Sequence, residues 1–124
     1  MDSHDLTFID GKWSYRDSYF GGTDFLGQET VWNSDQAVWA MNYYGYILRP
    51  DLIDAQRAGM VIKSALSALY ARGRFLGGFD YSLDGFVYRD EAVGDFQHFH
   101  GVETILRGGV VAYELRYHGG LVKA

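Results

Sequence analysis

The sequence has no cysteine among its 124 residues, which excludes disulfides, thiolate nucleophiles and cysteine-bound zinc. With only one proline, it contains no proline-rich linker. No apolar run approaches the roughly 18 residues that a membrane-spanning helix needs, so we expect no association with a membrane. Residues 1–5 have neither the positive charge nor the apolar stretch of a secretory signal, and we therefore expect a cytoplasmic protein.

Basic residues are also scarce. There are 11 Lys and Arg but 16 Asp and Glu, and the net charge of −5 argues against direct nucleic-acid binding. Apolar residues make up 48% and charged residues 22%, which is typical of a folded chain and excludes disorder. The length predicts a single domain over residues 1–124.

The most informative pattern is an internal repeat. The motifs in the first half are Tyr15-Arg16-Asp17, Phe25-x-Gly27-x-Glu29-Thr30 and Trp39-x-Met41-x-Tyr43-x-Gly45. They return in the second half as Tyr88-Arg89-Asp90, Phe99-x-Gly101-x-Glu103-Thr104 and Tyr113-x-Leu115-x-Tyr117-x-Gly119. We interpret residues 6–48 and 79–121 as a pseudo-repeat that arose by duplication; two similar hairpins with similar packing demands are the alternative.

Both halves show the period-two alternation and the aromatic and β-branched residues of strands. We expect strands at 6–9, 12–20, 26–32, 37–47, 79–83, 86–90, 96–106 and 110–118, with a loop at 91–95. Between the halves, apolar residues at helical spacing predict one long helix over 51–72. Its apolar stripe is Leu52, Ala55, Gly59, Ile62, Leu66 and Leu69, with Pro50 and Asp51 at its start and Arg72-Gly73 at its end.

These elements predict an α+β fold. It would contain two duplicated four-stranded antiparallel units in the order ββββ-α-ββββ, joined by the helix, which packs on the sheet. The sequence leaves open whether the two units form one sheet, a sandwich or a barrel.

Alternation along the last strand separates two faces. Glu114, Arg116 and His118 share one face, and the corresponding positions of the first half include Asn42 and Tyr44. Charged side chains in only one half are expected where that half has acquired a site; a solvated ion pair is the alternative. We predict a ligand-binding site beside the helix, formed by Trp39, Asn42, Tyr44, Glu103, Glu114, Arg116 and His118.

The repeated Glu29 and Glu103 fall on the apolar sides of their strands, where a carboxylate is costly unless it is paired. The equally repeated Arg16 and Arg89 are the expected partners, in one buried ion pair per half. The alternative is a carboxylate pair with raised pKa values that acts as acid and base.

We expect no metal and no cofactor. His98, His100 and His118 are the alternative metal ligands, but the spacing of the first two is common and the nearby phenylalanines favour packing. The Gly-Gly pairs match no nucleotide-binding fingerprint and are interpreted as turns. The 3 Trp and 10 Tyr fill the space between sheet and helix in our interpretation, with an exposed stacking platform as the alternative.

Several motifs together resemble a bacterial and archaeal family that is known only as a domain of unknown function. They are Arg16-Asp17-x-Tyr19-Phe20-Gly21-Gly22, Val38-Trp39-x-Met41-Asn42-Tyr43-Tyr44-Gly45, Gly94-Asp95-Phe96, Val111-x-Tyr113-Glu114 and His118-Gly119-Gly120. Members of this family often carry an extra helical segment, and some follow a helix-turn-helix DNA-binding domain; we expect this chain to lack both. The resemblance implies no activity, but a domain attached to a DNA-binding module often senses an effector.

We therefore predict a small ligand-binding or sensory module linked to transcriptional regulation, whose partner is a small molecule or another protein. One alternative is an acid–base hydrolase or isomerase that uses His118 with Glu114 or Glu103. Another is a structural protein–protein interaction domain that forms a homodimer through a sheet edge.

Overall fold

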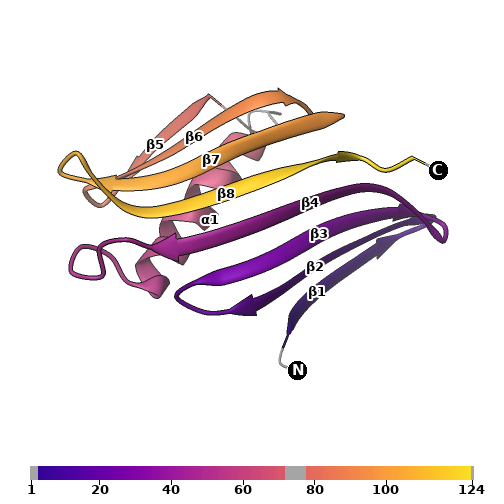
Figure 1. Ribbon diagram of the computed structural model, residues 1–124, viewed down its shortest axis with the longest axis horizontal. Helices are drawn as coiled ribbons and strands as arrows, with labels where there is room; N and C mark the ends of the chain where they lie inside the picture. Colours follow the sequence, from indigo (N-terminus) through magenta and orange to yellow (C-terminus); the bar gives the residue numbers. More distant parts are fainter. Residues whose placement is uncertain (1–2, 72–77, 124) are drawn as a thin grey trace.

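The computed structural model describes residues 3–71 and 78–123. Within these ranges, eight strands form one antiparallel sheet in the order β1-β2-β3-β4-β8-β7-β6-β5, and a helix lies across one face (Figure 1). The first four strands are β1 (His4–Asp10), β2 (Trp13–Gly21), β3 (Phe25–Asn33) and β4 (Gln36–Ile47). The helix α1 (Ala55–Ala71) is followed by β5 (Phe79–Leu83), β6 (Phe86–Asp95), β7 (His98–Arg107) and β8 (Val110–Leu121).

The predicted fold class, with two four-stranded units and a long central helix, is wrong. The structure is mostly one continuous sheet, because β4 pairs with β8 from Trp39 opposite Leu121 to Ile47 opposite Tyr113. This pairing gives hydrogen-bond partners to the backbone groups that two separate four-stranded units would leave exposed at their edges. The helix α1 begins at Ala55, four residues after the predicted start at residue 51. The duplication and the domain limits stay predictions.

Two-residue turns connect most neighbouring strands. Asp84 and Gly85 both have positive φ angles, 52° and 84°, as a type I′ hairpin turn requires. The loop predicted at 91–95 is wrong, because β6 continues to Asp95, which lies opposite His98. The backbone of this segment pairs with β7 and leaves only residues 96–97 for the turn.

The helix begins later than predicted because Asp54 caps it. Its Oδ1 accepts a hydrogen bond from the backbone N–H of Arg57 at 2.8 Å, which is the N-cap geometry. Asp51 lies in the preceding turn and pairs with the exposed Arg49 at 2.8 Å. The predicted end of the helix at Arg72-Gly73 lies outside the described residues.

The buried side of α1 is rotated by about one residue from the predicted stripe. Ala58, Val61, Ala65 and Leu69 are at most 4% exposed and pack against the sheet. Of the predicted stripe, Leu69 is buried as expected, but Ala55 and Gly59 are exposed, and Ile62 and Leu66 lie half-buried at the side of the contact. The small side chains of Ala58 and Ala65 allow the helix to lie close to the sheet. The spacing of apolar residues alone does not show which side of the helix makes this contact.

The helix covers the two halves of the sheet unequally. In Figure 1 it lies behind the central strands and the β5–β8 side, whereas β1 and β2 have no helix behind them. Leu6 and Phe8 of β1 are on the helix side of the sheet, yet they are 64% and 65% exposed. On this face, the helix therefore shields the β5–β8 half from solvent and leaves β1 and β2 exposed to it.

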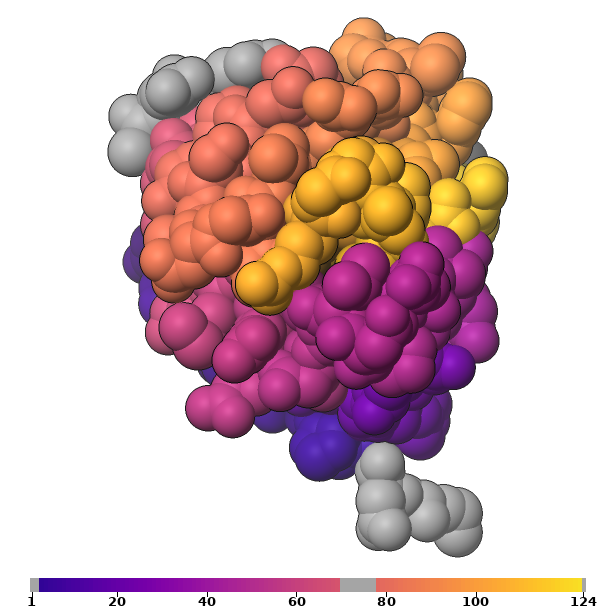
Figure 2. Space-filling model, turned by 90° about the vertical axis from the view of Figure 1, so that its left-hand side faces the viewer, coloured from indigo at the N-terminus to yellow at the C-terminus, as the bar shows by residue number. Residues whose placement is uncertain are grey.

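The segment that leads from β4 to α1 is anchored at one end of the sheet. Its Leu48 and Arg49 N–H groups both donate to the carbonyl oxygen of Ala112 on β8, at 2.8 and 3.1 Å. Figure 2 shows this segment in magenta beside the amber β7–β8 turn. No helix in the described part of the chain is long and apolar enough to cross a membrane.

Replacing the N-cap should weaken the attachment of the helix. Asp54→Ala removes the acceptor for the Arg57 N–H, and we expect the free energy of unfolding to fall by about 1 kcal/mol in urea denaturation. Asp51→Ala, which breaks only an exposed ion pair, is the matched control and should cost less. Equal losses in the two variants would contradict the assignment of Asp54 as the cap.

Candidate functional site

The two faces of the sheet carry different charged side chains. Asp17, Glu29, Asp90 and Glu103 lie on the face that the helix covers. Their neighbours in the chain point to the opposite face, because successive side chains of a strand alternate. That face therefore carries Arg16 and Arg89, and the groove on it is also lined by Arg116, His100 and His118.

In the first half, tyrosine hydroxyls hold the carboxylates of the helix-side face. Tyr15 on β2 donates to Oε1 of Glu29 on β3 at 2.6 Å. Tyr43 on β4 donates to Oδ1 of Asp17 on β2 at 2.5 Å, so its side chain crosses over β3. Three neighbouring strands are thus connected by side-chain hydrogen bonds.

The second half repeats these hydrogen bonds at the equivalent positions. Tyr88 on β6 donates to Oε2 of Glu103 on β7, and Tyr117 on β8 donates to Oδ1 of Asp90 on β6 at 2.6 Å. Here the carboxylates are deeper, with Asp90 0% and Glu103 6% exposed. We call each set of two tyrosines, one aspartate and one glutamate a tyrosine–carboxylate motif.

A glycine under each crossing tyrosine makes the motif possible. A Cβ atom built on Gly27 would lie 2.4 Å from the Tyr43 hydroxyl oxygen. A Cβ atom on Gly101 would lie 2.3 Å from Cζ of Tyr117. The repeated Gly-x-Glu sequence therefore provides both the carboxylate and the space for the ring that crosses above it.

The predicted buried ion pairs of Glu29 with Arg16 and of Glu103 with Arg89 are wrong. Arg16 lies over the Trp32 ring, 5.3 Å from its centroid, and Arg89 pairs with the exposed Asp80 at 3.1 Å. Each arginine precedes an aspartate of the helix-side face, and alternation directs it away from that face. The repeated tyrosines in the same Tyr-Arg-Asp motif were the signal for the true partners.

The burial of these carboxylates changes their acidity. Burial raises the pKa of Glu103 from its ordinary value of 4.5 to about 7; the charges of Asp90 and Glu29 add to the rise, and the Tyr88 hydrogen bond opposes it. Burial also raises the pKa of Glu29. Burial raises the pKa of Tyr113 as well, with a contribution from the charge of Glu103.

A cavity of about 220 Å³ lies between α1 and the sheet at this cluster, and we call it the helix-side cavity. Asp17, Glu29 and Glu103 line it, together with Tyr43, Tyr113 and Tyr117. Its apolar lining includes Phe25, Trp39 and Met41 from the sheet, and Ile62 and Leu66 from the helix. Its ceiling is thus the side of α1 that is only half-buried.

The hydroxyl of Tyr113 has no hydrogen-bond partner among the described residues, although it is buried and lines the helix-side cavity. Tyr113 is only 1% exposed. Leaving a buried hydroxyl without a partner costs about 1–3 kcal/mol, so this group needs an explanation beyond packing.

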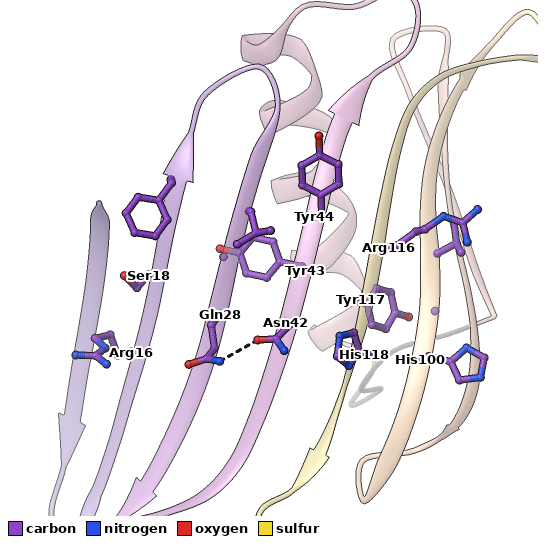
Figure 3. Close-up of a pocket in the computed structure, with 15 residues that line it drawn as sticks. Arg16, Ser18, Gln28, Asn42, Tyr43, Tyr44, His100, Arg116, Tyr117 and His118 are labelled. Carbon is purple, nitrogen blue, oxygen red and sulfur yellow. Dashed lines mark hydrogen bonds between the residues drawn. The ribbon is translucent and has the colours of Figure 1, made fainter. Parts of the chain in front are cut away.

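On the opposite face lies a wider, more open groove of about 820 Å³, which we call the outer groove. One row of polar side chains crosses it on five adjacent strands: Ser18, Gln28, Asn42, His118 and His100. Gln28 donates to Asn42 at 2.9 Å, and Arg16 and Arg116 lie at its two sides (Figure 3).

The structure divides the predicted site residues between the two faces. Asn42, Tyr44, Arg116 and His118 line the outer groove, and Glu114 is on the same face, 3.4 Å from Arg116 and bonded to the Tyr46 hydroxyl. Trp39 and Glu103 instead line the helix-side cavity. Trp39 stacks on Phe99 at 5.8 Å between ring centroids and donates to the Phe96 carbonyl.

The histidines do not assemble a metal centre within the described ranges. No group of three or more His, Asp or Glu side chains in residues 3–71 and 78–123 has a metal-binding arrangement. His118 and Glu103 lie on opposite faces, and Glu114 is four residues from His118, about 13 Å along the strand. The acid–base pairs considered from the sequence are therefore not in contact.

Comparison with known proteins identifies one family. A family model described as "Domain of unknown function (DUF5680)" matches residues 17–122. No curated protein and no solved structure matches the chain significantly.

A side chain at Gly101 should disrupt the second tyrosine–carboxylate motif. We expect Gly101→Ala to lower the free energy of unfolding by about 1–3 kcal/mol in urea denaturation, because its Cβ would collide with the Tyr117 ring. Gly59→Ala is the control: this helix glycine is exposed, nothing lies near an added Cβ, and the change should stabilise by up to about 1 kcal/mol. If Gly101→Ala left the free energy of unfolding unchanged, the position of the Tyr117 ring over Gly101 would not be required for stability.

The raised pKa of Glu103 predicts how stability depends on pH. Since the folded state keeps a proton that the unfolded chain loses above about pH 4.5, stability should fall as the pH rises towards about 7. Glu103→Gln should remove this loss, worth up to about 3 kcal/mol, from melting curves between about pH 5 and pH 8. Glu91→Gln on the exposed side of β6 is the control. The same pH slope in the Glu103→Gln and wild-type proteins would refute the assignment.

Proposed function

The chain belongs to this DUF5680 family, whose function is unknown, and we propose that it is a ligand-binding module with its site in the helix-side cavity. The observation that carries the proposal is the unpartnered Tyr113 hydroxyl in a cavity that polar and aromatic side chains line together. Apolar walls with a few directed polar groups are the usual composition of small-molecule sites. A bound molecule would supply the partner that the protein does not.

The size of the cavity limits the ligand. Its volume of about 220 Å³ is below the range of about 300–1,000 Å³ that is typical of sites for drug-sized molecules. The occupant is therefore a small metabolite-sized molecule, with one ring or a short chain. Asp17 on β2 lines the cavity, and the neighbouring β1 has exposed side chains on the same face, so we propose that the ligand enters from this side.

The outer groove is a weaker candidate, although it contains most residues that the sequence suggested. The Arg116 side chain is 68% exposed there, and Gln28 already donates a hydrogen bond to Asn42. Exposed polar side chains bond to water when no ligand is present, so an empty site costs them little free energy. A buried hydroxyl without a partner pays the full cost of its lost hydrogen bonds to water. The structure thus favours the face with Trp39 and Glu103 over the face with Asn42, Tyr44, Arg116 and His118.

A sensory role linked to transcriptional regulation is the biological setting that the resemblance to helix-turn-helix fusions suggests, and it stays a prediction. So does a homodimer formed through a sheet edge. For the latter, β1 is the suitable edge, because it is exposed along its length and carries the apolar Leu6 and Phe8. Light scattering over a range of protein concentrations measures that state directly.

Blocking the cavity should abolish binding. We would screen single-ring aromatic fragments by thermal shift and ligand-observed NMR, and expect hits to raise the melting temperature by about 5–15 °C at about 100 times the dissociation constant. Ile62→Phe enlarges a side chain of the cavity ceiling and should eliminate these hits. Met60→Phe, at an exposed position of the same helix, is the size-matched control.

Variants of the outer groove complete this test. Arg116→Ala and His118→Ala should keep both the melting temperature and the fragment hits, because they line only the opposite face. Hits that survive Ile62→Phe but disappear in these variants would move the site to the outer groove. A screen without any hit would count against the proposed function as a whole.

A further inference from the structure

The lining of the helix-side cavity has negative charge but no positive charge. Asp17, Glu29 and Glu103 line it, and none of the described lining residues is lysine, arginine or histidine. Arg16 and Arg89, which precede Asp17 and Asp90 in the repeated Tyr-Arg-Asp motif, are engaged on the other face. Carboxylates out of water are stabilised by a cation, whereas the side-chain partners of these three among the described residues are tyrosine hydroxyls.

These hydroxyls leave part of each carboxylate available. Glu29 accepts from Tyr15 through Oε1, and Asp17 accepts from Tyr43 through Oδ1. Glu103 accepts from Tyr88 through Oε2. An ionised carboxylate has about four acceptor positions on its two oxygens, so each can take a further donor from a bound molecule.

The walls of the cavity suit a cation with an apolar body. Phe25 stacks on Tyr113 with ring centroids 6.5 Å apart and meets Tyr43 edge-on at 6.0 Å. Trp39 and Met41 continue this surface on β4. Aromatic rings attract cations through their negatively charged faces, most strongly where water is excluded.

The Tyr113 hydroxyl adds a requirement for a hydrogen-bonding group. It is the buried unpartnered atom of the cavity, and its oxygen can accept an N–H while its proton turns to another acceptor. A quaternary ammonium has no N–H to offer, whereas a protonated primary or secondary amine does. The carboxylates and this hydroxyl therefore favour the same donor.

Building on the proposed ligand-binding function, we propose that the occupant is a protonated primary or secondary amine carried on a small aromatic or apolar body. Its ammonium group lies at Glu29, Glu103 and Tyr113, and its body lies against the aromatic wall. The cation supplies the charge that the carboxylates lack, and its N–H groups supply the partner that Tyr113 lacks.

Such a ligand should bind less tightly in acid. The titratable groups around Glu103 are Tyr88 and Asp90 from β6, Glu29 from β3, and Tyr113 and Tyr117 from β8. Because its pKa is about 7 in the empty protein, Glu103 is largely neutral near pH 5 and charged near pH 8. Binding of a cation near neutral pH should thus release protons, which calorimetry in buffers of different ionisation enthalpy detects.

Four probes that share the phenylethyl skeleton test the proposal: phenethylamine, its N,N,N-trimethyl derivative, 2-phenylethanol and 3-phenylpropanoate. At about pH 8 we expect phenethylamine to bind about tenfold or more tightly than 2-phenylethanol, and the anion not to bind. Tyr113→Phe should weaken phenethylamine several-fold and leave the trimethyl derivative unchanged. Glu103→Gln should weaken both cations and remove the pH dependence of their affinity.

The outcomes separate this proposal from the one on which it rests. Phenethylamine and 2-phenylethanol could bind with equal affinity, and Ile62→Phe could abolish the binding of both. That result would contradict the proposal that the ligand is an amine, but it would support the cavity as a binding site. Fragment hits without any binding of the two cations would do the same. No hit in either set would refute both proposals. Circular dichroism and melting curves of Tyr113→Phe, which breaks no hydrogen bond of the empty protein, keep the result independent of folding.

Discussion

The structure depends on how it accommodates carboxylates on the covered face of a sheet. In the part of the chain that the structure describes, tyrosine hydroxyls donate hydrogen bonds to Asp17, Glu29, Asp90 and Glu103. A tyrosine can lie flat across a neighbouring strand, where an arginine would bring a second charge that also needs solvation. The tyrosine–carboxylate hydrogen bonds connect three strands in each half and keep the carboxylates beneath the helix.

Much of the strand pattern could be predicted, because alternation is a local property of the chain. It correctly placed Glu29 and Glu103 on the apolar face. Their partners could not be predicted from adjacency, since the nearby arginines point the other way and Tyr43 reaches across a strand. Whether the two halves form one sheet stayed open, because the pairing of β4 with β8 has no local signal in the sequence.

The candidate site was only partly predictable, because it depends on contacts between segments that are distant in the sequence. Divergence between the halves pointed to positions such as Asn42, Tyr44, Arg116 and His118, which line the outer groove. Trp39 and Glu103, which belong to the repeated motifs, line the cavity instead. Tyr113 was assigned to packing, and its lack of a hydrogen-bond partner becomes visible only when three strands and the helix are in place. Because α1 covers the second half of the sheet more than the first, the tyrosine–carboxylate motif of the second half is buried. The motif of the first half stays partly exposed.

The junction between β4 and β8 also has a consequence for the folding rate. Within each half, strands joined by two-residue turns meet neighbours close by in the chain, and such hairpins form in microseconds. The junction instead pairs residues as distant as Trp39 and Leu121, so the intervening chain must first be brought together. High contact order slows folding, and this single strand pair contributes a large share of it. Until it forms, the edges of β4 and β8 have unpaired backbone groups, and we expect partly folded chains to associate through them at high concentration.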